Sequence, residues 1–221
     1  MAEGGGGGRG GQVPHVGVRA YPGAVNPALR IGPDGLARCA WVGDDAEYRR
    51  YHDEEWGVPL HGDRALFEKL CLEGFQSGLS WILVLRRREA FRELFDGFDP
   101  ARVAAYTDGD VERLLGDARI IRNRAKIEAA IGNARALLAL EERDGPDALD
   151  ALVWSAAEPP RTERPAESTD LPASTPASRA LSATLRKAGF RFVGPVTVYA
   201  LMQSAGVVDD HLEGCWRAVE L

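Results

Sequence analysis

The sequence predicts an all-α domain, because apolar residues recur at helical spacing along most of the chain. In the first such segment, Leu66, Phe67 and Leu70 follow Asp63, a residue type that caps helices. Two later segments end at glycine, as helices commonly do. The chain shows neither strand–helix alternation nor internal repeats, which argues against a parallel sheet. The expected helices cover residues 66–71, 79–95, 99–106, 111–115, 123–142, 178–189 and 194–206.

The composition fits a globular domain preceded by a tail. The chain has 221 residues, of which 45% are hydrophobic and 27% are charged, enough for one sizeable core. Residues 1–37 contain eleven of the 25 glycines, and such a segment buries too little apolar surface to offset the entropy of ordering. We therefore expect a disordered tail over residues 1–37 and a folded domain over residues 38–221. Residues 155–178, rich in Pro, Ser, Thr and Glu, are expected to form an irregular surface segment.

Two pairs of residues near the ends of the expected domain have the composition of a zinc site. Twelve residues separate Cys39 from His52, and three separate His211 from Cys215. Tetrahedral Zn²⁺ prefers thiolate and imidazole ligands, and two residues four apart can point the same way. A shared ion would join the ends of the domain and restrict the unfolded chain. The alternative is two buried thiols and two surface imidazoles, since the spacing differs from that of common zinc fingers.

The cysteine count and the hydropathy indicate where the protein works. Three cysteines, two of them with a metal explanation, cannot form a disulfide framework, which favours a reducing cytoplasm. Cys71 lies in the apolar run KLCLEGF and is expected to be a core residue. No apolar run approaches the ~18–20 residues that span a membrane, and the N-terminus lacks the layout of a secretory signal. A cytoplasmic protein without a membrane segment is therefore expected.

A basic segment in the middle of the chain has the layout of a helix–hairpin–helix motif. The net charge of −6 disfavours a nucleic-acid partner, yet residues 118–137 carry five basic residues against one glutamate. In this motif, backbone N–H groups and the N-terminus of the second helix receive a DNA phosphate. An ordinary corner between two helices is the alternative, and Arg119 stands where such a hairpin usually has glycine. The residues expected to anchor the hairpin or to face the DNA backbone are Ile120, Ile121, Arg122, Arg124 and Lys126.

The chain also concentrates aromatic residues and carries one unusual acid. Tyrosine and tryptophan can hold an extruded base, although stacked rings can equally form a core. Glu73 lies within the apolar stretch LCLEGF, and a buried carboxylate needs a partner. It is therefore a candidate either for function or for a satisfied structural contact. The aromatic residues are Trp41, Tyr48, Tyr51 and Trp56, all within sixteen positions, and then Trp81.

Five blocks of the chain, taken in order, resemble DNA-3-methyladenine glycosylase I, a constitutive bacterial family that removes 3-methyladenine from alkylated DNA. The similarity covers residues 38–217, nearly the whole expected domain. It implies an all-α helix–hairpin–helix DNA glycosylase fold in which a zinc clasp joins the N- and C-terminal ends. The blocks are RCAWVGDDAEYRRYHDEEWGVP, LFEKLCLEGFQSGLSWILVLRRR, DARIIRNRAKIEAAIGNARA, STPASRALSATLRKAGFRFVGPVTVYALMQSAGVVDDH and HLEGC.

The resemblance also implies roles for individual residues. Glu73 and Tyr51 would hydrogen-bond the edge of the methylated adenine, and Trp81 would stack on its ring. Leu79 would enter the gap left in the DNA stack, and the hairpin would hold a phosphate. Further matches to aromatic positions around the pocket are Trp41, Tyr48 and Trp56. The matches to ligands of a structural zinc ion, with all four positions filled by protein, are Cys39, His52, His211 and Cys215.

The implied reaction is hydrolysis of the N-glycosidic bond of 3-methyladenine in double-stranded alkylated DNA. N3-methylation makes adenine cationic, so the base leaves readily and the enzyme mainly has to recognise it. An ionised Glu73 would accept a hydrogen bond from the exocyclic amine and repel the O6 of guanine. No lysine nucleophile is implied. We therefore expect a monofunctional, monomeric enzyme that needs no small-molecule cofactor, releases the free base and leaves an abasic site.

Two other functions fit parts of the pattern. A non-catalytic zinc-containing DNA-binding module would use the hairpin and the metal for docking alone. In that case Glu73, Tyr51 and Trp81 would have no reason to converge. A zinc hydrolase is disfavoured, because four Cys and His ligands leave no open position for water.

Overall fold

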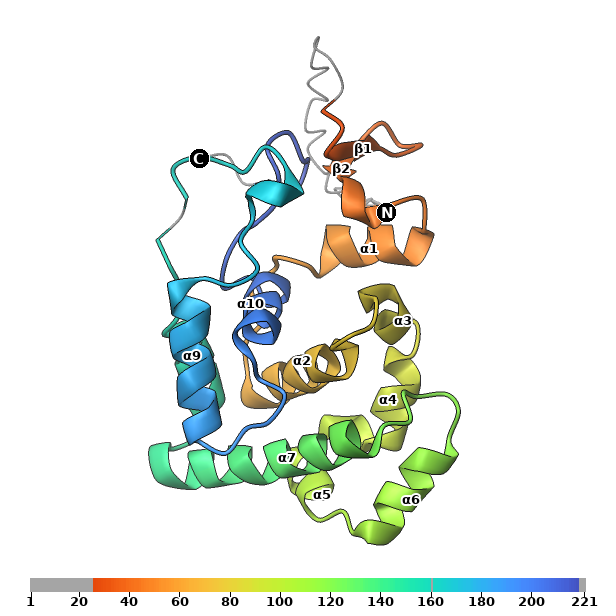
Figure 1. The fold of residues 1–221 in the computed structure, drawn as a ribbon, viewed down its shortest axis with the longest axis vertical. Coiled ribbons are helices and arrows are strands. Elements are labelled where there is room, and N and C mark those ends of the chain that lie inside the picture. Colours follow the sequence, from red (N-terminus) through yellow and green to blue (C-terminus); the bar gives the residue numbers. More distant parts are fainter. Residues whose placement is uncertain (1–25, 160, 219–221) are drawn as a thin grey trace, which may run out of the picture.

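Ten α-helices and a short β-hairpin make up the described part of the computed structural model, residues 26–159 and 161–218 (Figure 1). The strands β1 (Leu29–Ile31) and β2 (Ala37–Cys39) pair antiparallel. The helices are α1 (Ala46–Glu54), α2 (Asp63–Gln76), α3 (Trp81–Leu85), α4 (Arg88–Leu94), α5 (Pro100–Ala104), α6 (Asp108–Gly116), α7 (Arg124–Asp144), α8 (Ala148–Trp154), α9 (Pro176–Lys187) and α10 (Pro195–Ser204). Single 3₁₀ turns are η1 (Ala40–Val42), η2 (Asp96–Phe98) and η3 (Ser168–Asp170).

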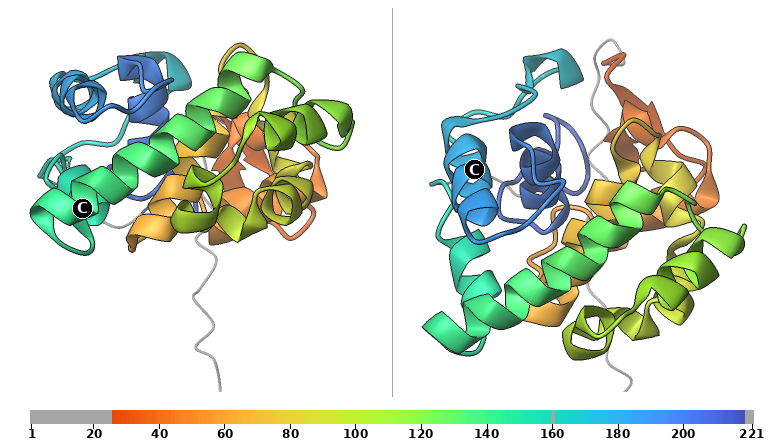
Figure 2. Two further views of the ribbon diagram at one scale, coloured as in Figure 1. Left: turned by 90° about the horizontal axis from the view of Figure 1, so that it is seen from below. Right: turned by 60° about the horizontal axis from the view of Figure 1, so that its bottom comes forward.

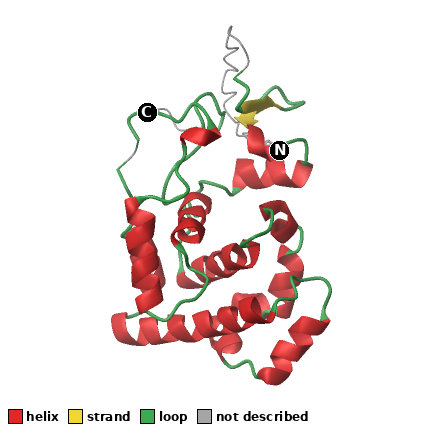
Figure 3. Cartoon of the chain, in the orientation of Figure 1, coloured by secondary structure: helices red, strands yellow, loops and turns green. Residues whose placement is uncertain are grey.

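The predicted helical fold is confirmed, with one addition, the hairpin β1–β2 (yellow in Figure 3). Strand β1 lies inside residues 1–37, so regular structure begins ahead of the predicted domain boundary. Gly35, with a φ of +78°, permits the turn, and the Arg38 guanidinium fastens it with hydrogen bonds of 2.9 and 2.7 Å to Asp34. Strands of three residues are too short to show an alternating pattern. Residues 1–25 of the predicted tail lie outside the described residues.

Helix α2 lies at the centre of the molecule, in contact with α3, α7, α8 and α10 (Figures 1 and 2). Ten of its 14 residues are buried, on more than one face, as expected for a helix enclosed by others. Phe67 and Phe75 extend into the main core and contact aromatic rings of α4 and η2. Because Lys69 and Glu73 also lie on this enclosed helix, two ionisable side chains are carried into the interior.

The predicted continuous helix over residues 79–95 is wrong, because the structure divides it into α3 and α4. The chain turns between Leu85 and Arg88, and this turn lets Arg88 reach inward to pair with Glu55. Helical spacing of the apolar residues continues across the break, so periodicity alone did not reveal it. Leu79 lies ahead of both helices in an exposed turn.

Helices α1 and α8 were not predicted. Helix α1 is mostly polar, and its first turn is stabilised by Asp45, whose side chain accepts a hydrogen bond from the backbone N–H of Tyr48. The irregular segment predicted over residues 155–178 is confirmed up to the start of α9, apart from the turn η3. In residues 26–159 and 161–218 no helix combines the length and the hydropathy that crossing a bilayer requires.

The predicted hairpin is present as α6 and α7, joined by residues 117–123. Asn123 caps α7 by accepting a backbone N–H of its first turn. No residue of this connection has a positive φ, so Arg119 fits the turn without the conformation that favours glycine. The Arg119 guanidinium instead pairs with Asp117 and Glu93.

A close backbone contact joins the end of α10 to the loop that follows α1. The backbone N–H of Leu60 donates a hydrogen bond of 3.0 Å to the carbonyl of Ala205. Gly206 follows with a φ of +72°, and a Cβ atom there would lie 2.6 Å from the carbonyl carbon of Val58. Glycine is therefore required both by the backbone conformation and by the space available.

Gly206→Ala should lower the free energy of unfolding by about 2–4 kcal/mol, since it adds both left-handed strain and a backbone clash. Gly132→Ala is the matched control. Gly132 lies inside α7 with open space around its Cβ position, so alanine should raise the free energy of unfolding by about 0.5–1 kcal/mol. Urea unfolding followed by circular dichroism measures both effects. If the two substitutions changed the free energy of unfolding equally, the close backbone contact at Gly206 would not stabilise the fold.

Candidate functional site

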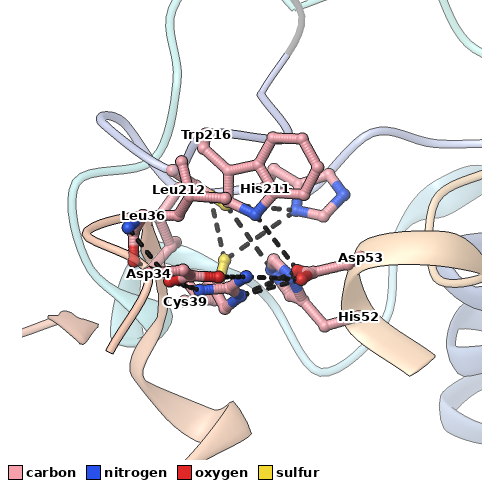
Figure 4. Close-up of polar contacts among 10 residues, drawn as sticks. Asp34, Leu36, Cys39, His52, Asp53, His211, Leu212 and Trp216 are labelled. Carbon is pink, nitrogen blue, oxygen red and sulfur yellow. Dashed lines mark hydrogen bonds and ion pairs between the residues drawn. The ribbon is translucent and has the colours of Figure 1, made fainter. Parts of the chain in front are cut away.

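The four predicted metal ligands come together at one buried point (Figure 4). Cys39 ends β2, His52 lies in α1, and His211 and Cys215 lie in the segment after α10. Their ligand atoms all lie within 4.8 Å of one another. The Sγ of Cys215 is 3.5 Å from the Nε2 of His52 and 3.6 Å from the Nδ1 of His211. The Sγ of Cys39 is 4.0 Å from the same Nδ1 of His211.

This geometry fits a tetrahedral ion. Zinc–sulfur bonds of ~2.3 Å and zinc–nitrogen bonds of ~2.0 Å place neighbouring ligand atoms about 3.3–3.8 Å apart. The pKa of the Cys215 thiol is lowered, because it accepts hydrogen bonds from Cys39 and from the two imidazoles. The pKa of the Cys39 thiol, which donates to Cys215 and is buried, is raised. A divalent cation would favour the thiolate form of both, so the cluster suits a metal site that joins the two ends of the fold.

Polar contacts around the cluster orient its ligands (Figure 4). The Nδ1 of His52 lies 2.8 Å from the Oδ1 of Asp53, which directs the Nε2 toward the cluster. Asp53 also accepts hydrogen bonds from the Nε1 of Trp216 at 3.1 Å and from the Nη2 of Arg38 at 2.6 Å. Contacts of this kind between a carboxylate and a ligating imidazole fix the orientation of the ring and raise its basicity.

The predicted tryptophans Trp41 and Trp56 lie against the metal cluster. The centroid of the Trp56 ring is 6.2 Å from that of His52 and 4.7 Å from that of His211. Trp41 lies 5.2 Å from Trp56 and 5.4 Å from His52, and it also reaches within 4.9 Å of Tyr48. Both tryptophans therefore contact metal ligands, a placement that the sequence did not predict. Trp41 also links these ligands to the rings nearer α2.

Three further rings lie around the buried acid of α2. The Tyr51 centroid is 6.4 Å from that of Tyr48 and 5.5 Å from that of Trp81. Tyr51 is 1% exposed and Glu73 is 4% exposed. Burial, and then the charge of Glu73, raise the pKa values of Tyr48 and Tyr51, so both phenols stay protonated. The structure thus brings the predicted acid and three of the five predicted rings to one place, which we call the base slot after the role proposed for it below (Glu73, Tyr48, Tyr51 and Trp81).

Glu73 has an unusual ionisation. Burial raises its pKa to about 7, against the opposing effects of the Lys69 charge and of a hydrogen bond from Ser204. The Oγ of Ser204 donates to the Oε1 of Glu73 at 3.0 Å. Near neutral pH the carboxyl is therefore divided between its protonated and ionised forms. A perturbed acid in a site lined by rings is a candidate for recognition.

Sequence reasoning missed Lys69 and Ser204. The Nζ of Lys69 lies 5.2 Å from the ring centroid of Tyr51 and 5.8 Å from that of Trp81, within the range of cation–π contacts. Burial lowers the pKa of Lys69, and attraction to Glu73 opposes this effect. The spacing of four residues between Lys69 and Glu73 could have revealed the pair. Nothing in the sequence marks Ser204, which lies 131 residues away from its partner.

Trp81 retains an unused hydrogen-bond donor. Its Nε1 atom is buried and has no hydrogen-bond partner within the described residues. Buried donors in folded proteins are nearly always satisfied, so an unpaired donor in a site calls for an explanation. A polar atom of a bound ligand could accept this hydrogen bond.

Leu79 and two hairpin arginines are available at the surface. Leu79 is 37% exposed in the turn before α3. Arg122 is exposed and makes no ion pair or hydrogen bond with the rest of the described chain. Arg124 pairs with Glu112 and Glu128, so its charge is partly compensated.

The other predicted hairpin residues point into the protein. Ile120 is 3% exposed in the main core, and Ile121 packs against that core. The Nζ of Lys126 donates hydrogen bonds of 2.8 and 2.7 Å to the carbonyls of Phe75 and Ser77. Lys126 therefore holds the C-terminal end of α2, a different contact from the predicted one to a DNA phosphate.

Helices packed around α2, a hairpin between α6 and α7, and a buried acid beside aromatic rings are the features of a helix–hairpin–helix DNA glycosylase. The family model described as methyladenine glycosylase matches residues 41–218, and the chain belongs to this family. The family that the five sequence blocks predicted is thereby confirmed.

Relatives of known function and structure agree with this membership. The chain is 50% identical to DNA-3-methyladenine glycosylase 1 of Escherichia coli over 181 residues, which cover 81% of this chain and 96% of that protein. It is 46% identical to DNA-3-methyladenine glycosylase of Haemophilus influenzae over 179 residues, 80% of this chain and 96% of that protein. A crystal structure of a 3-methyladenine DNA glycosylase I has a TM-score of 0.78 at 50% identity, covering 82% of this chain and 100% of that one. The Staphylococcus aureus enzyme has a TM-score of 0.77 at 34% identity, covering 83% and 97%.

Cys215→Ser should abolish metal binding, because it replaces a thiolate ligand by a hydroxyl that stays protonated. Bound metal measured by mass spectrometry should fall to background, and the melting temperature should fall with it. Cys71→Ala is the matched control, since it removes a buried thiol of α2 outside the cluster and should leave the metal in place. Full metal occupancy in Cys215→Ser would contradict the assignment of the cluster.

Glu73→Gln should stabilise the protein at high pH. Because the folded-state pKa is raised, stability is complete below the ordinary value of 4.5 and is lost as pH rises to about 7. Glutamine stays neutral, so the variant should gain on the order of 3 kcal/mol of unfolding free energy at pH 8 and little at pH 4.5. Urea unfolding at the two pH values measures this. The substitution Glu142→Gln, at an exposed position, should show no such dependence. If Glu73→Gln changed the free energy of unfolding equally at both pH values, the pKa of Glu73 would not be raised in the folded protein.

Proposed function

We propose that this protein removes 3-methyladenine from alkylated DNA by hydrolysing the bond between the base and its sugar. The observation that carries the proposal is the buried Glu73 carboxyl beside Tyr51 and Trp81, in a chain of the methyladenine glycosylase family. Relatives 50% and 46% identical are named for this activity. A related enzyme, 34% identical, is described as a tyrosine-to-phenylalanine variant in complex with 3-methyladenine.

The chemistry requires little acid catalysis. N3-methylation gives adenine a positive charge while it is still attached to the sugar. When the glycosidic bond breaks, its electron pair goes to the base, which leaves as a neutral purine. Water then adds to the oxocarbenium-like sugar and loses a proton. Because the leaving group is already activated, the enzyme contributes mainly extrusion and recognition, and unstacking the base costs a few kcal/mol.

Recognition of the base depends on the ionised form of Glu73. Its carboxylate accepts a hydrogen bond from the exocyclic amine and complements the positive charge of the methylated ring. The same carboxylate repels the O6 of guanine, which excludes that base. Tyr51, which stays protonated, holds the same edge of the base, and Trp81 stacks on the ring. The unpaired Nε1 of Trp81 is available to a ligand atom in the base slot.

The exposed residues around the slot would hold double-stranded DNA. Leu79, in the turn between α2 and α3, enters the gap left by the extruded nucleotide. The N-terminus of α7 presents backbone N–H groups to a phosphate, with Arg122 and Arg124 beside it. Lys126 is left out of this set, because its ammonium is engaged by the carbonyls of α2.

The ion that fits the Cys₂His₂ cluster best is zinc, in a structural role. Two thiolates and two imidazoles match the ligand preference of zinc, and four protein ligands leave no position for a reacting water. Bound there, the ion supplies no chemistry to the reaction. It would fasten α1, which carries Tyr48 and Tyr51, to the C-terminal segment.

The proposed mechanism uses no nucleophile from the enzyme. Lys69 packs against the faces of two rings and is not assigned an attack on the sugar, so the enzyme is monofunctional. A monomeric state, independence of small-molecule cofactors and a cytoplasmic location stay predictions of the sequence.

Incubation with methylated duplex DNA should release free 3-methyladenine, identified by mass spectrometry, and should leave unbroken strands with abasic sites. At pH 8 Glu73→Gln should lower kcat/KM by about 10- to 100-fold, the loss expected for one charge-assisted hydrogen bond. The exposed substitution Glu142→Gln should retain the wild-type rate. Absence of any released base from the wild-type protein would reject the proposed function.

A further inference from the structure

One serine of α10 donates a hydrogen bond to the Glu73 carboxyl. Ser204 is 3% exposed, and its hydroxyl donates to the Oε1 of Glu73 at 3.0 Å. Within the described residues this is the one hydrogen bond that the carboxyl receives. The Oε1 atom is therefore held in place, and the Oε2 atom has no hydrogen-bond partner within the described residues.

The same hydroxyl has a second acceptor within reach. The Oγ of Ser204 lies 3.3 Å from the backbone carbonyl of Leu201. When Glu73 is ionised, the hydroxyl proton points to the carboxylate. When Glu73 is protonated, its carboxyl can donate to the Oγ while the hydroxyl proton turns to Leu201. Because a hydroxyl both donates and accepts, Glu73 can gain or lose a proton without leaving a polar atom unpaired.

A buried cation on the same helix adds an electrostatic contribution. Lys69 is 8% exposed and lies one turn before Glu73 on α2. Its ammonium lies over the rings of Tyr51 and Trp81 and makes no hydrogen bond within the described residues. A nearby positive charge in a poorly hydrated environment favours the ionised form of an acid. Lys69 therefore stabilises the carboxylate of Glu73 through space.

Ser204 and Lys69 also line a cavity of about 210 Å³ that lies beyond them. The walls of this cavity include Glu55 and Glu68 but neither Glu73 nor the rings of the slot. The cavity therefore adjoins the two residues that interact with Glu73 without reaching the carboxyl itself.

We propose that Ser204 and Lys69 are positioning residues for base recognition, which favour the ionised form of Glu73 and leave its Oε2 to accept a hydrogen bond from the exocyclic amine of the base. This inference rests on the proposed function, because it requires that Glu73 accepts a hydrogen bond from that amine. Protonated Glu73 loses its proton to solvent water as the base enters, so one proton is released to solvent in this step.

The other titratable groups around Glu73 either keep their protons or interact with other partners. From α1, Tyr48 and Tyr51 stay protonated, because burial and the carboxyl raise their pKa values. From α7, Lys126 is bound to carbonyls at the end of α2. Helix α3 contributes Trp81, and α8 and η2 meet α2 near its first turn. The ion pairs next to Lys69 are Arg88–Glu55 and Arg92–Glu68.

The test is the pH dependence of 3-methyladenine release from a methylated duplex under single-turnover conditions. The wild-type rate should fall as pH falls through about 7, because protonated Glu73 cannot accept the amine. Ser204→Ala and Lys69→Met should each move this decline upward by about one pH unit. Their rates should then be about tenfold below wild type at pH 6 and close to wild type at pH 9. Ser204→Cys, which keeps the shape and a weaker donor, should give a smaller shift.

Two control variants make the same chemical changes elsewhere. Ser182→Ala removes a buried hydroxyl of α9 that donates to the carbonyl of Val193 at 2.6 Å, and it should leave the pH midpoint in place. Lys187→Met removes an exposed charge at the end of the same helix and should also leave it in place. Melting temperature and bound metal show that each variant is folded.

A wild-type pH midpoint in folded Ser204→Ala and Lys69→Met overturns the positioning role. Absence of released base from the wild-type protein at every pH is failure of the proposed function itself. If the wild-type protein is active and Glu73→Gln releases base at the same rate at every pH, Glu73 is not the recognition group, so the positioning role fails while the activity stands. If Glu73→Gln removes the pH dependence while the two variants leave it unmoved, the recognition role of Glu73 stands and the positioning role fails.

Discussion

The burial of an ionisable carboxyl in the central helix is the constraint on which the rest of the site depends. Enclosure of α2 on several faces removes water from Glu73 and raises its pKa, and the charge of Lys69 and the hydroxyl of Ser204 offset only part of this effect. The favourable interactions of an ionised Glu73 therefore offset only part of the free-energy cost of burying its charge. In the proposed function, a cationic base with an exocyclic amine would supply the missing favourable interaction, so a residue that is unfavourable for stability would be selective for binding.

The metal cluster bears on the same site through α1. This helix has nine residues, of which two, Tyr51 and His52, are buried. One faces Glu73 and the next is a metal ligand, so the position of the phenol in the slot depends on the cluster that holds its neighbour. Trp41 and Trp56 contact the imidazoles, and Trp41 also contacts Tyr48 of the slot. The cluster that joins the two ends of the described chain can therefore fix the geometry of a site in its middle.

The helical fold, the grouping of the Cys and His residues and the presence of a buried acid near aromatic rings could be predicted because each leaves a local mark: apolar spacing, ligand types at fixed separation, and an acid inside an apolar run. What the sequence did not predict depends on contacts between distant segments. Strand β1 is too short to alternate, and periodicity continues across the break between α3 and α4. From the sequence alone Lys126 is expected to be a surface cation, whereas in the structure its ammonium donates hydrogen bonds to two backbone carbonyls at the end of α2. Ser204 resembles any helical serine, and only the packing of α10 on α2 gives it Glu73 as a partner.

The ionisation of Glu73 can be observed directly by carbon-13 NMR of its side-chain carboxyl, assigned by comparison with Glu73→Gln. In the free protein the resonance should titrate with a midpoint near 7. Saturation with free 3-methyladenine should move the midpoint to lower pH, because the bound amine favours the carboxylate. A midpoint near the ordinary value of 4.5 in the free protein, or one that does not move when the base binds, would contradict the account.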